Sequence, residues 1–159
     1  FMGLVKEYDI SPAGLKLEIT ESAVIMDVPK QAALIEKLQA EGFVVEMDDF
    51  GSGYSSLNTL KDIPVDILKL DMKFMEKSKN TKRSADIVQM VVAMADKLGM
   101  PVIAEGVETK EQADFLGRIG CDIIQGYYYA KPMSMEEFEQ LLNKYPYRDI
   151  VQKGIGNDI

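Results

Sequence analysis

Two adjacent carboxylates, Asp48 and Asp49, mark the stretch of the chain best suited to chemistry. The apolar residues 43–45 precede them and predict a buried strand, and Gly51 and Gly53 follow in a loop that leads into a helix. Adjacent carboxylates repel, so both stay ionised near neutral pH only if cations or donors offset their charge. Glycine lets the backbone approach a ligand closely. The pattern indicates a divalent-metal and phosphate site; an ordinary βα loop whose aspartates cap the next helix is the alternative.

The composition excludes several classes of site. Among 159 residues, 18 are Lys or Arg and 26 are Asp or Glu, so the net charge is −8. The chain also has no basic run, and both features argue against a DNA- or RNA-binding surface. The chain has no histidine and one cysteine, Cys121, which excludes a Ser-His-Asp triad and a Cys/His-rich zinc site. Oxygen ligands would hold any metal ion, which favours Mg²⁺, Mn²⁺ or Ca²⁺. No apolar run is long enough to cross a bilayer, so we expect a cytoplasmic segment without membrane contact.

Predicted strands and helices alternate along the chain. The hydrophobic pattern predicts strands over residues 15–20, 43–47, 66–71, 101–104 and 122–125, with a short sixth strand near 127–129. It predicts a first helix that ends before residue 10, and further helices from Pro29 to Gly42, over residues 55–62 and over residues 83–98. Two more helices run from the Thr109 capping box to Gly120 and from Ser134 onward. The core face of helix 83–98 should hold Ile87, Val88, Val91, Met94, Ala95 and Leu98. Such alternation implies an α/β fold, a parallel sheet covered by helices.

Polar residues follow the predicted strands at their carboxyl-terminal ends: Glu18, Thr20, Asp48, Asp49, Lys69, Asp71, Glu105 and Gln125. Lys69 and Asp71 are two residues apart and point to one face of their strand, whereas Leu68 and Leu70 take the opposite face, toward the helices. In parallel α/β barrels, side chains from several strands build the active site at this edge. We therefore expect one shared site.

Five of these residues are carboxylates, and four of them, at positions 18, 48, 49 and 105, would converge at this edge. Such a cluster binds hard divalent cations, and two ions can activate a bridging water and clamp an in-line phosphoryl displacement. Lys69 could orient the water or neutralise developing charge, and Gln125 could hydrogen-bond the ligand. Each has a simpler alternative. Lys69 could pair only with Asp71, Gln125 could satisfy a loop backbone, and Glu108 could serve only the dipole of the next helix.

Five motifs, in order along the chain, resemble the EAL domain. They are Leu17–Ser22, Asp48–Leu57, Leu68–Asp71, Ile103–Thr109 and Gln125–Tyr127, and the resemblance covers roughly residues 1–142. It implies a TIM-like (β/α) barrel that hydrolyses cyclic di-GMP to linear pGpG with Mg²⁺ or Mn²⁺, in a two-metal site when the domain is complete. This activity would serve bacterial second-messenger signalling.

The resemblance also implies roles for individual residues. Glu18, Asp48 and Glu105 look like metal ligands, and Asp49 looks like a ligand of the second metal. Lys69 is similar to the lysine that positions the catalytic water, and Glu105 shares the catalytic role. The residues similar to substrate-binding or supporting positions are Glu21, Gly51, Ser52, Gly53, Asp71, Glu108 and Gln125. Of these, Glu21 resembles the glutamate that steadies the loop 50–56, which the family associates with metal binding and dimer coupling.

The sequence departs from the family at its amino-terminal side. The Glu-Ala-Leu motif and the asparagine-bearing strand that follows it are absent and would lie before Phe1. We count five clear strands where a closed barrel needs eight. We therefore expect an incomplete barrel: a partial EAL domain over residues 1–144, then a tail or linker over 145–159. This piece alone should be weakly active or inactive.

Unpaired sheet edges invite pairing with another chain. We expect a homodimer, or fusion to an upstream sensory or GGDEF-type domain, in the cytoplasm or in the cytoplasmic part of a membrane-bound sensor. The alternative to an enzyme is a non-catalytic cyclic di-GMP receptor or dimerisation module.

Overall fold

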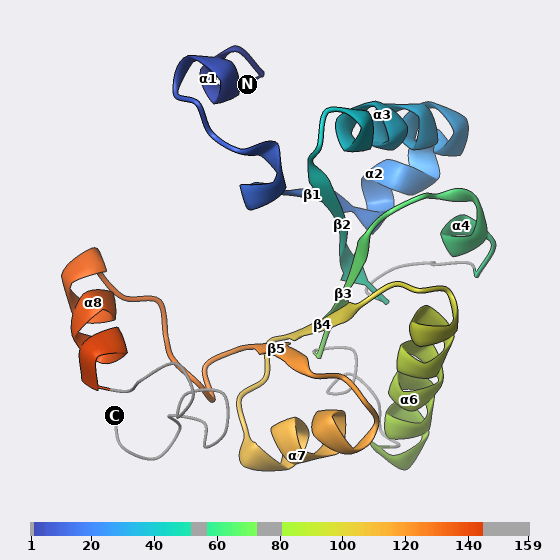
Figure 1. Cartoon of the computed structure of the whole chain (residues 1–159). Coiled ribbons are helices and arrows are strands. Elements are labelled where there is room, and N and C mark those ends of the chain that lie inside the picture. Colours follow the sequence, from blue (N-terminus) through green and yellow to red (C-terminus); the bar gives the residue numbers. More distant parts are fainter. Residues whose placement is uncertain (1, 52–56, 73–80, 145–159) are drawn as a thin grey trace.

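Five parallel strands form one sheet whose order follows the sequence, β1-β2-β3-β4-β5 (Figure 1). The computed structural model describes residues 2–51, 57–72 and 81–144, so the predicted tail 145–159 lies outside it. The strands are β1 (Lys16–Thr20), β2 (Val44–Phe50), β3 (Ile67–Asp71), β4 (Val102–Glu105) and β5 (Ile123–Gln125). The predicted α/β alternation and all five clear strands are confirmed.

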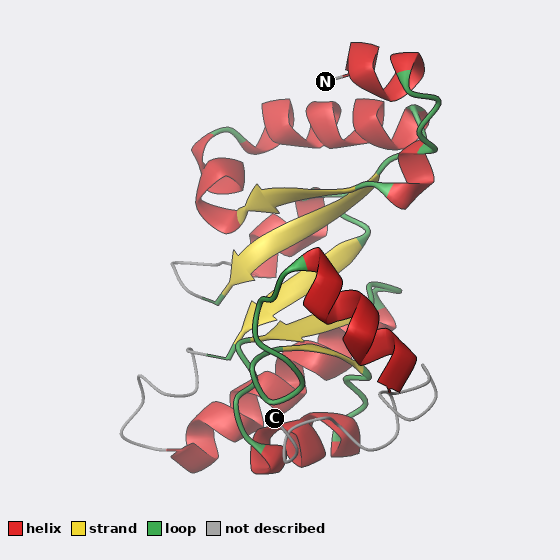
Figure 2. Cartoon of the chain, turned by 90° about the vertical axis from the view of Figure 1, so that its left-hand side faces the viewer, coloured by secondary structure: helices red, strands yellow, loops and turns green. Residues whose placement is uncertain are grey.

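Most of the described helices connect the strands and cover one face of the sheet. They are α1 (Met2–Glu7), α2 (Glu21–Met26), α3 (Val28–Ala40), α4 (Leu57–Asp62), α6 (Thr81–Lys97), α7 (Lys110–Arg118) and α8 (Met135–Lys144), with a 3₁₀ turn at Pro12–Gly14. In Figure 1 the helices from α2 to α7 lie on one side of the strands, and α1 and α8 lie on the other. Figure 2, turned by 90°, shows α8 in front of the sheet. None of the described helices combines the length and apolar character that crossing a bilayer requires.

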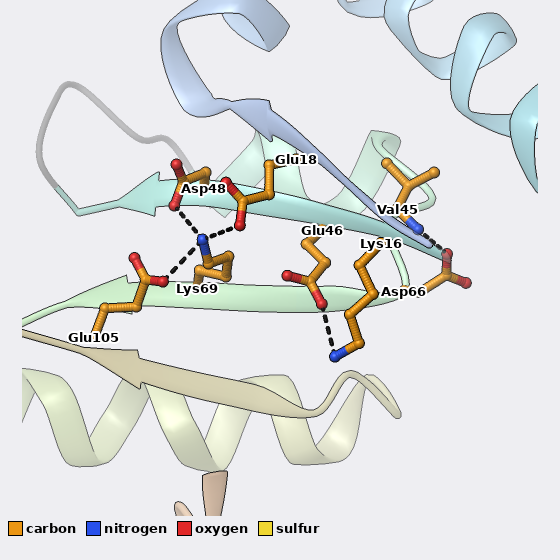
Figure 3. Close-up of polar contacts among 8 residues, drawn as sticks. All are labelled: Lys16, Glu18, Val45, Glu46, Asp48, Asp66, Lys69 and Glu105. Atoms are coloured by element: carbon orange, nitrogen blue, oxygen red, sulfur yellow. Dashed lines mark hydrogen bonds and ion pairs between the residues drawn. The ribbon is translucent and has the colours of Figure 1, made fainter. Parts of the chain in front are cut away.

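The two faces of the sheet differ in polarity, as the alternation of strand residues predicts. Met47, Leu68 and Leu70 are buried on the face that packs against the helices. Their neighbours Glu46, Asp48 and Lys69 take the opposite parity and lie on the other face (Figure 3). The core thus occupies one side of the sheet, and the other side is lined with charge.

The core face of α6 differs from the prediction. Val88, Val92 and Ala95 are at most 3% exposed. Ile87 and Leu98, which the pattern placed in the core, are 37% and 55% exposed. The pattern is ambiguous because α6 carries apolar residues on more than one side, and packing against the sheet selects the buried face.

Two other parts of the chain differ from the prediction. The possible strand near residues 127–129 is a turn, in which the Tyr128 N–H donates to the Val107 carbonyl at 3.0 Å. Helix α2 was not predicted: the Thr20 side chain, assigned to a strand end, also accepts a hydrogen bond from the Ala23 N–H and so caps this helix. The capping box at Thr109 is confirmed, since Thr109 and Gln112 bond reciprocally.

Candidate active site

Three carboxylates converge on the ammonium group of Lys69 at the carboxyl-terminal half of the sheet (Figure 3). Lys69 Nζ lies 2.5 Å from Glu18 Oε1, 2.8 Å from Glu105 Oε1 and 3.1 Å from Asp48 Oδ1. Because all three oxygens lie within 3.1 Å of one nitrogen, no two of them can be further apart than twice that distance. Strands β1, β2 and β4 supply the carboxylates, and β3 supplies the lysine.

The parallel register accounts for this meeting point. Thr20 of β1 pairs with Asp48 of β2, so Glu18 lies two residues earlier on the adjacent strand and on the same face. On the other side, Asp71 of β3 pairs with Glu105 of β4. Asp71 therefore lies beside Glu105, and its Oδ1 would be 3.6 Å from a Cβ at Gly106.

A β-bulge interrupts the pairing of β2 with β3 at the two aspartates. Met47 pairs with Leu68 and Phe50 pairs with Leu70, so Asp48 and Asp49 both stand opposite Lys69. Asp49 adopts a left-handed backbone conformation at this bulge, with a φ of 57°. This conformation costs energy for a residue with a side chain. Asp48 turns toward Lys69, whereas Asp49 is exposed and, among the described residues, takes no part in the ion pairs around Lys69.

Burial and charge oppose each other at the centre of this cluster. Burial would lower the pKa of Lys69, but its contacts with the three carboxylates outweigh burial and raise the pKa well above the ordinary value. Burial raises the pKa of Glu105; Lys69 opposes that shift, and the neighbouring carboxylates reinforce it. Lys69 therefore stays charged, and Glu105 holds a proton more readily than an exposed glutamate does.

The cluster has the carboxylate oxygens that a metal site needs, but these oxygens surround Lys69 Nζ and not an open metal position. In the described part of the chain, no three Asp, Glu or Cys side chains are set to hold a metal ion, and Lys69 Nζ occupies the point between the carboxylates. Asp48 Oδ1 and Glu105 Oε1 are buried and, beyond their ion pair with Lys69, lack a hydrogen-bond partner among the described residues. Such oxygens suit Mg²⁺ or Mn²⁺, so these residues fit a divalent ion once Lys69 withdraws.

Glu21 supports the backbone that follows the two aspartates. Its side chain is 2% exposed, and Oε2 accepts a hydrogen bond from the Gly51 N–H at 3.2 Å. Gly51 has a φ of 93°, which favours glycine. Ser52 and Gly53, the other loop residues predicted for the site, lie outside the described residues.

A cavity of about 510 Å³ opens beside the ends of β4 and β5. Two predicted residues, Gln125 and Glu108, line it together with Tyr127, Pro132, Met133 and Phe138. The sequence prediction missed the last four residues. Gly126, which also lines the cavity, was the available signal, because a glycine after a strand can mark a close approach of two backbone segments; here a Cβ would collide with the backbone of Val107.

Comparisons with known proteins agree with this geometry. The sequence model of one family, the EAL domain, matches residues 1–132. The chain is 40% identical over 131 residues to the cyclic di-GMP phosphodiesterase NbdA of Pseudomonas aeruginosa, an alignment that covers 82% of this chain and 17% of NbdA. It is 39% identical over 130 residues to the bifunctional diguanylate cyclase/cyclic di-GMP phosphodiesterase MucR of the same bacterium, covering 82% of this chain and 19% of MucR.

Solved structures show the same likeness. The MucR phosphodiesterase in complex with c-di-GMP superposes with a TM-score of 0.79 at 37% identity, covering 86% of this chain and 56% of that one. The EAL domain of DcpA from Mycobacterium smegmatis superposes with a TM-score of 0.78 at 40% identity, covering 89% of this chain and 64% of that one. This chain therefore spans less than two thirds of each relative. Its five-stranded sheet is an incomplete TIM-like barrel, and the chain belongs to the EAL domain family.

Proposed function

We propose that this chain is the metal-dependent phosphodiesterase part of a protein that hydrolyses cyclic di-GMP to linear pGpG. One observation carries the proposal: carboxylates from three strands converge on a buried lysine at the sheet edge where parallel α/β barrels build their active sites. Relatives that bear the name cyclic di-GMP phosphodiesterase support the choice of substrate.

Glu18, Asp48 and Glu105 would hold the metal, and Asp49 at the bulge would hold a second ion. Bound Mg²⁺ or Mn²⁺ would supply positive charge that stabilises the phosphodiester during in-line displacement. The strained backbone of Asp49 supports this role, because strain of this kind collects at functional sites.

Hydrolysis forms a bond from water oxygen to phosphorus and breaks one phosphorus–oxygen ester bond, whose oxygen leaves with a proton. Lys69, held charged by its raised pKa, would donate a hydrogen bond that orients the water or the phosphate. Glu105, whose pKa burial raises, would accept the proton that water loses. Glu21 would keep the loop after β2 in place through its bond to Gly51.

The cavity next to Gln125 supports a dinucleotide substrate. Its volume, about 510 Å³, falls in the range of small-molecule pockets, and Tyr127 and Phe138 offer aromatic surface for a purine base. The Gln125 amide and the Glu108 carboxylate offer polar partners at its wall.

A second function, binding without turnover, has one observation in its favour: Lys69 occupies the centre of the carboxylates. A cyclic di-GMP receptor that signals through dimerisation would not need that lysine to move. In the whole protein, this segment would be joined to a further domain, such as the diguanylate cyclase that the name of MucR gives for that relative. We propose a cytoplasmic location for this segment.

Incubation with cyclic di-GMP and Mn²⁺ or Mg²⁺, followed by chromatography for pGpG, tests the enzyme proposal. The 159-residue chain should turn over weakly or not at all, and the same segment within a complete domain should produce pGpG. Calorimetry with Ca²⁺ in place of Mn²⁺ then measures ligand binding separately. Binding by the complete domain without any pGpG would favour the receptor.

A further inference from the structure

A second ion pair lies on the same face of the sheet as the Lys69 cluster (Figure 3). Lys16 Nζ on β1 lies 3.0 Å from Glu46 Oε1 on β2; the Lys16 side chain is 52% exposed, and that of Glu46 is 4% exposed. Glu46 Oε1 is buried and, beyond this ion pair, has no hydrogen-bond partner among the described residues. This buried oxygen of Glu46 therefore has the half-exposed Lys16 as its cation.

Glu46 is a neighbour of the candidate site both across the strands and along its own strand. It pairs in register with Glu18 on β1, and it precedes Asp48 by two residues on the same face of β2. Figure 3 shows its carboxylate on the same side of the sheet as Lys69. Glu46 thus adds a fourth carboxylate to the face that carries Glu18, Asp48 and Glu105.

We propose that Lys16 is a positioning residue: its pairing with Glu46 keeps Lys69 directed at Glu18, Asp48 and Glu105. Without Lys16, Glu46 becomes a buried carboxylate with no compensating charge, which is strongly unfavourable. Lys69 is a buried cation on the neighbouring strand, two residues beyond Ile67, which pairs with Glu46. Because Glu46 also pairs with Glu18, Lys69 would turn from Glu105 toward Glu46 while it stays beside Glu18. An effect of Lys16 on hydrolysis rests on the proposed function, whereas its effect on the position of Lys69 does not.

Crystal structures of the whole 159-residue chain and its Lys16→Met variant test the arrangement directly, in metal-free buffer. Lys69 Nζ should leave Glu105, which lies 2.8 Å away in the native chain, and move to within ion-pair distance of Glu46. A variant in which Lys69 keeps all three of its carboxylate contacts would overturn the proposal.

Titration with Mn²⁺ gives a second readout that simple structural damage would not produce. Lys16→Met removes a positive charge and draws Lys69 away from the metal ligands, so the variant should bind Mn²⁺ several-fold more tightly. In a complete domain the same change should lower kcat, because Lys69 no longer faces the substrate. Damage to the fold would instead weaken Mn²⁺ binding and turnover together, and that result would contradict the proposal.

Two variants serve as matched controls. Lys16→Arg keeps the charge and should retain native Mn²⁺ affinity. Lys110→Met removes an equal charge from an exposed pair on α7, where Lys110 Nζ lies 2.7 Å from Asp114 Oδ2, and should leave Mn²⁺ affinity unchanged. A shift in affinity with Lys110→Met as large as that with Lys16→Met would show a general charge effect and count against Lys16.

If Lys16→Met does not fold, the pair Glu46→Gln and Glu46→Gln/Lys16→Met decides the matter. Once Glu46 is neutral, Lys16 should no longer matter, so Lys69 should keep its native contacts in both proteins. Displacement of Lys69 in the double variant alone would overturn the proposal. Failure of the native chain to bind Mn²⁺ would count against the proposed metal site, while the position of Lys69 would still decide the role of Lys16.

Discussion

Lys69 of β3 and Glu105 of β4 form an ion pair across neighbouring parallel strands, with 2.8 Å between Nζ and Oε1. The lysine is 5% exposed; burial lowers its pKa, but Glu105, Glu18 and Asp48 together raise the pKa above its ordinary value. The glutamate is also partly buried, and its pKa is raised despite the lysine. A single ammonium group therefore contacts three carboxylates and offsets only part of their charge, so a change in the cations at this point should alter both stability and chemistry.

Lys69→Met should destabilise the metal-free chain by about 3–5 kcal/mol, because it leaves adjacent, partly buried carboxylates without a cation. Mn²⁺ should then restore more stability to the variant than to the native chain, since metal binding to the folded state adds to its stability. Urea unfolding in EDTA and in Mn²⁺ measures both effects. An equal response of the two proteins to Mn²⁺ would mean that Lys69 does not share its place with a metal ion. In a complete domain, the variant should lose turnover and retain ligand binding.

Asp49 combines a left-handed backbone with a predicted role as a ligand of the second metal. Asp49→Asn keeps a residue that tolerates this conformation, so its free energy of unfolding should stay within about 0.5 kcal/mol of the native value, whereas Asp49→Ala should cost about 1 kcal/mol. Asn lacks the charge, and Mn²⁺ affinity should fall by about tenfold. A metal titration of Asp49→Asn that matches the native chain would remove Asp49 from the ligand set.

The fold could be predicted from sequence because its signals are local. Hydrophobic runs mark the strands, and the capping box at Thr109 and the glycine at position 42, which has a φ of 91°, mark helix ends. The same alternation placed Glu18, Asp48, Lys69 and Glu105 at one edge, and the structure brings these four together.

The remaining features depend on pairing between strands, which no local pattern encodes. The bulge at Asp48 and Asp49 arises from the register of β2 against β3. It directs Asp48 toward Lys69 and leaves Asp49 exposed, a difference that the hydrophobic pattern does not predict. The Lys16–Glu46 pair depends on the register of β1 against β2 in the same way. The turn at 127–129 resembled a strand because its tyrosines favour strands, but hydrogen bonds to Val107 and Gly126 hold it as a turn.

Gly126 lines the cavity and lies against the backbone of Val107, and Gly126→Ala should be strongly destabilising. Its Cβ would collide with the backbone of Val107, and backbone atoms cannot move aside as a flexible side chain can. Gly117→Ala is the matched control, because its Cβ meets nothing within 4 Å on helix α7 and should add about 0.5–1 kcal/mol of stability. Thermal unfolding of both variants checks the pair. A Gly126→Ala protein as stable as the native chain would show that the approach to Val107 is not obligatory.

Helix α8 should lose its amino-terminal cap in acid. Glu137 accepts a hydrogen bond from the Ser134 N–H at 2.8 Å, and this bond, together with that from the Ser134 side chain, lowers the pKa of Glu137 below its ordinary 4.5. A lowered pKa in the folded state means that the cap contributes fully above pH 4.5 and is lost as the pH falls through the folded pKa. The protection of the Ser134 amide, which is its hydrogen-exchange rate compared with the intrinsic rate at the same pH, should fall over that window. Glu137→Gln should show no such pH-dependent loss of protection, and an identical profile for both proteins would exclude Glu137 as its cause.

Anomalous diffraction from crystals of the chain soaked in Mn²⁺ tests the central claim most directly. The account predicts a manganese peak among the side-chain oxygens of Glu18, Asp48 and Glu105, with Lys69 Nζ displaced from the point between them. Saturating Mn²⁺ that leaves Lys69 in place, with no peak beside these carboxylates, would contradict it.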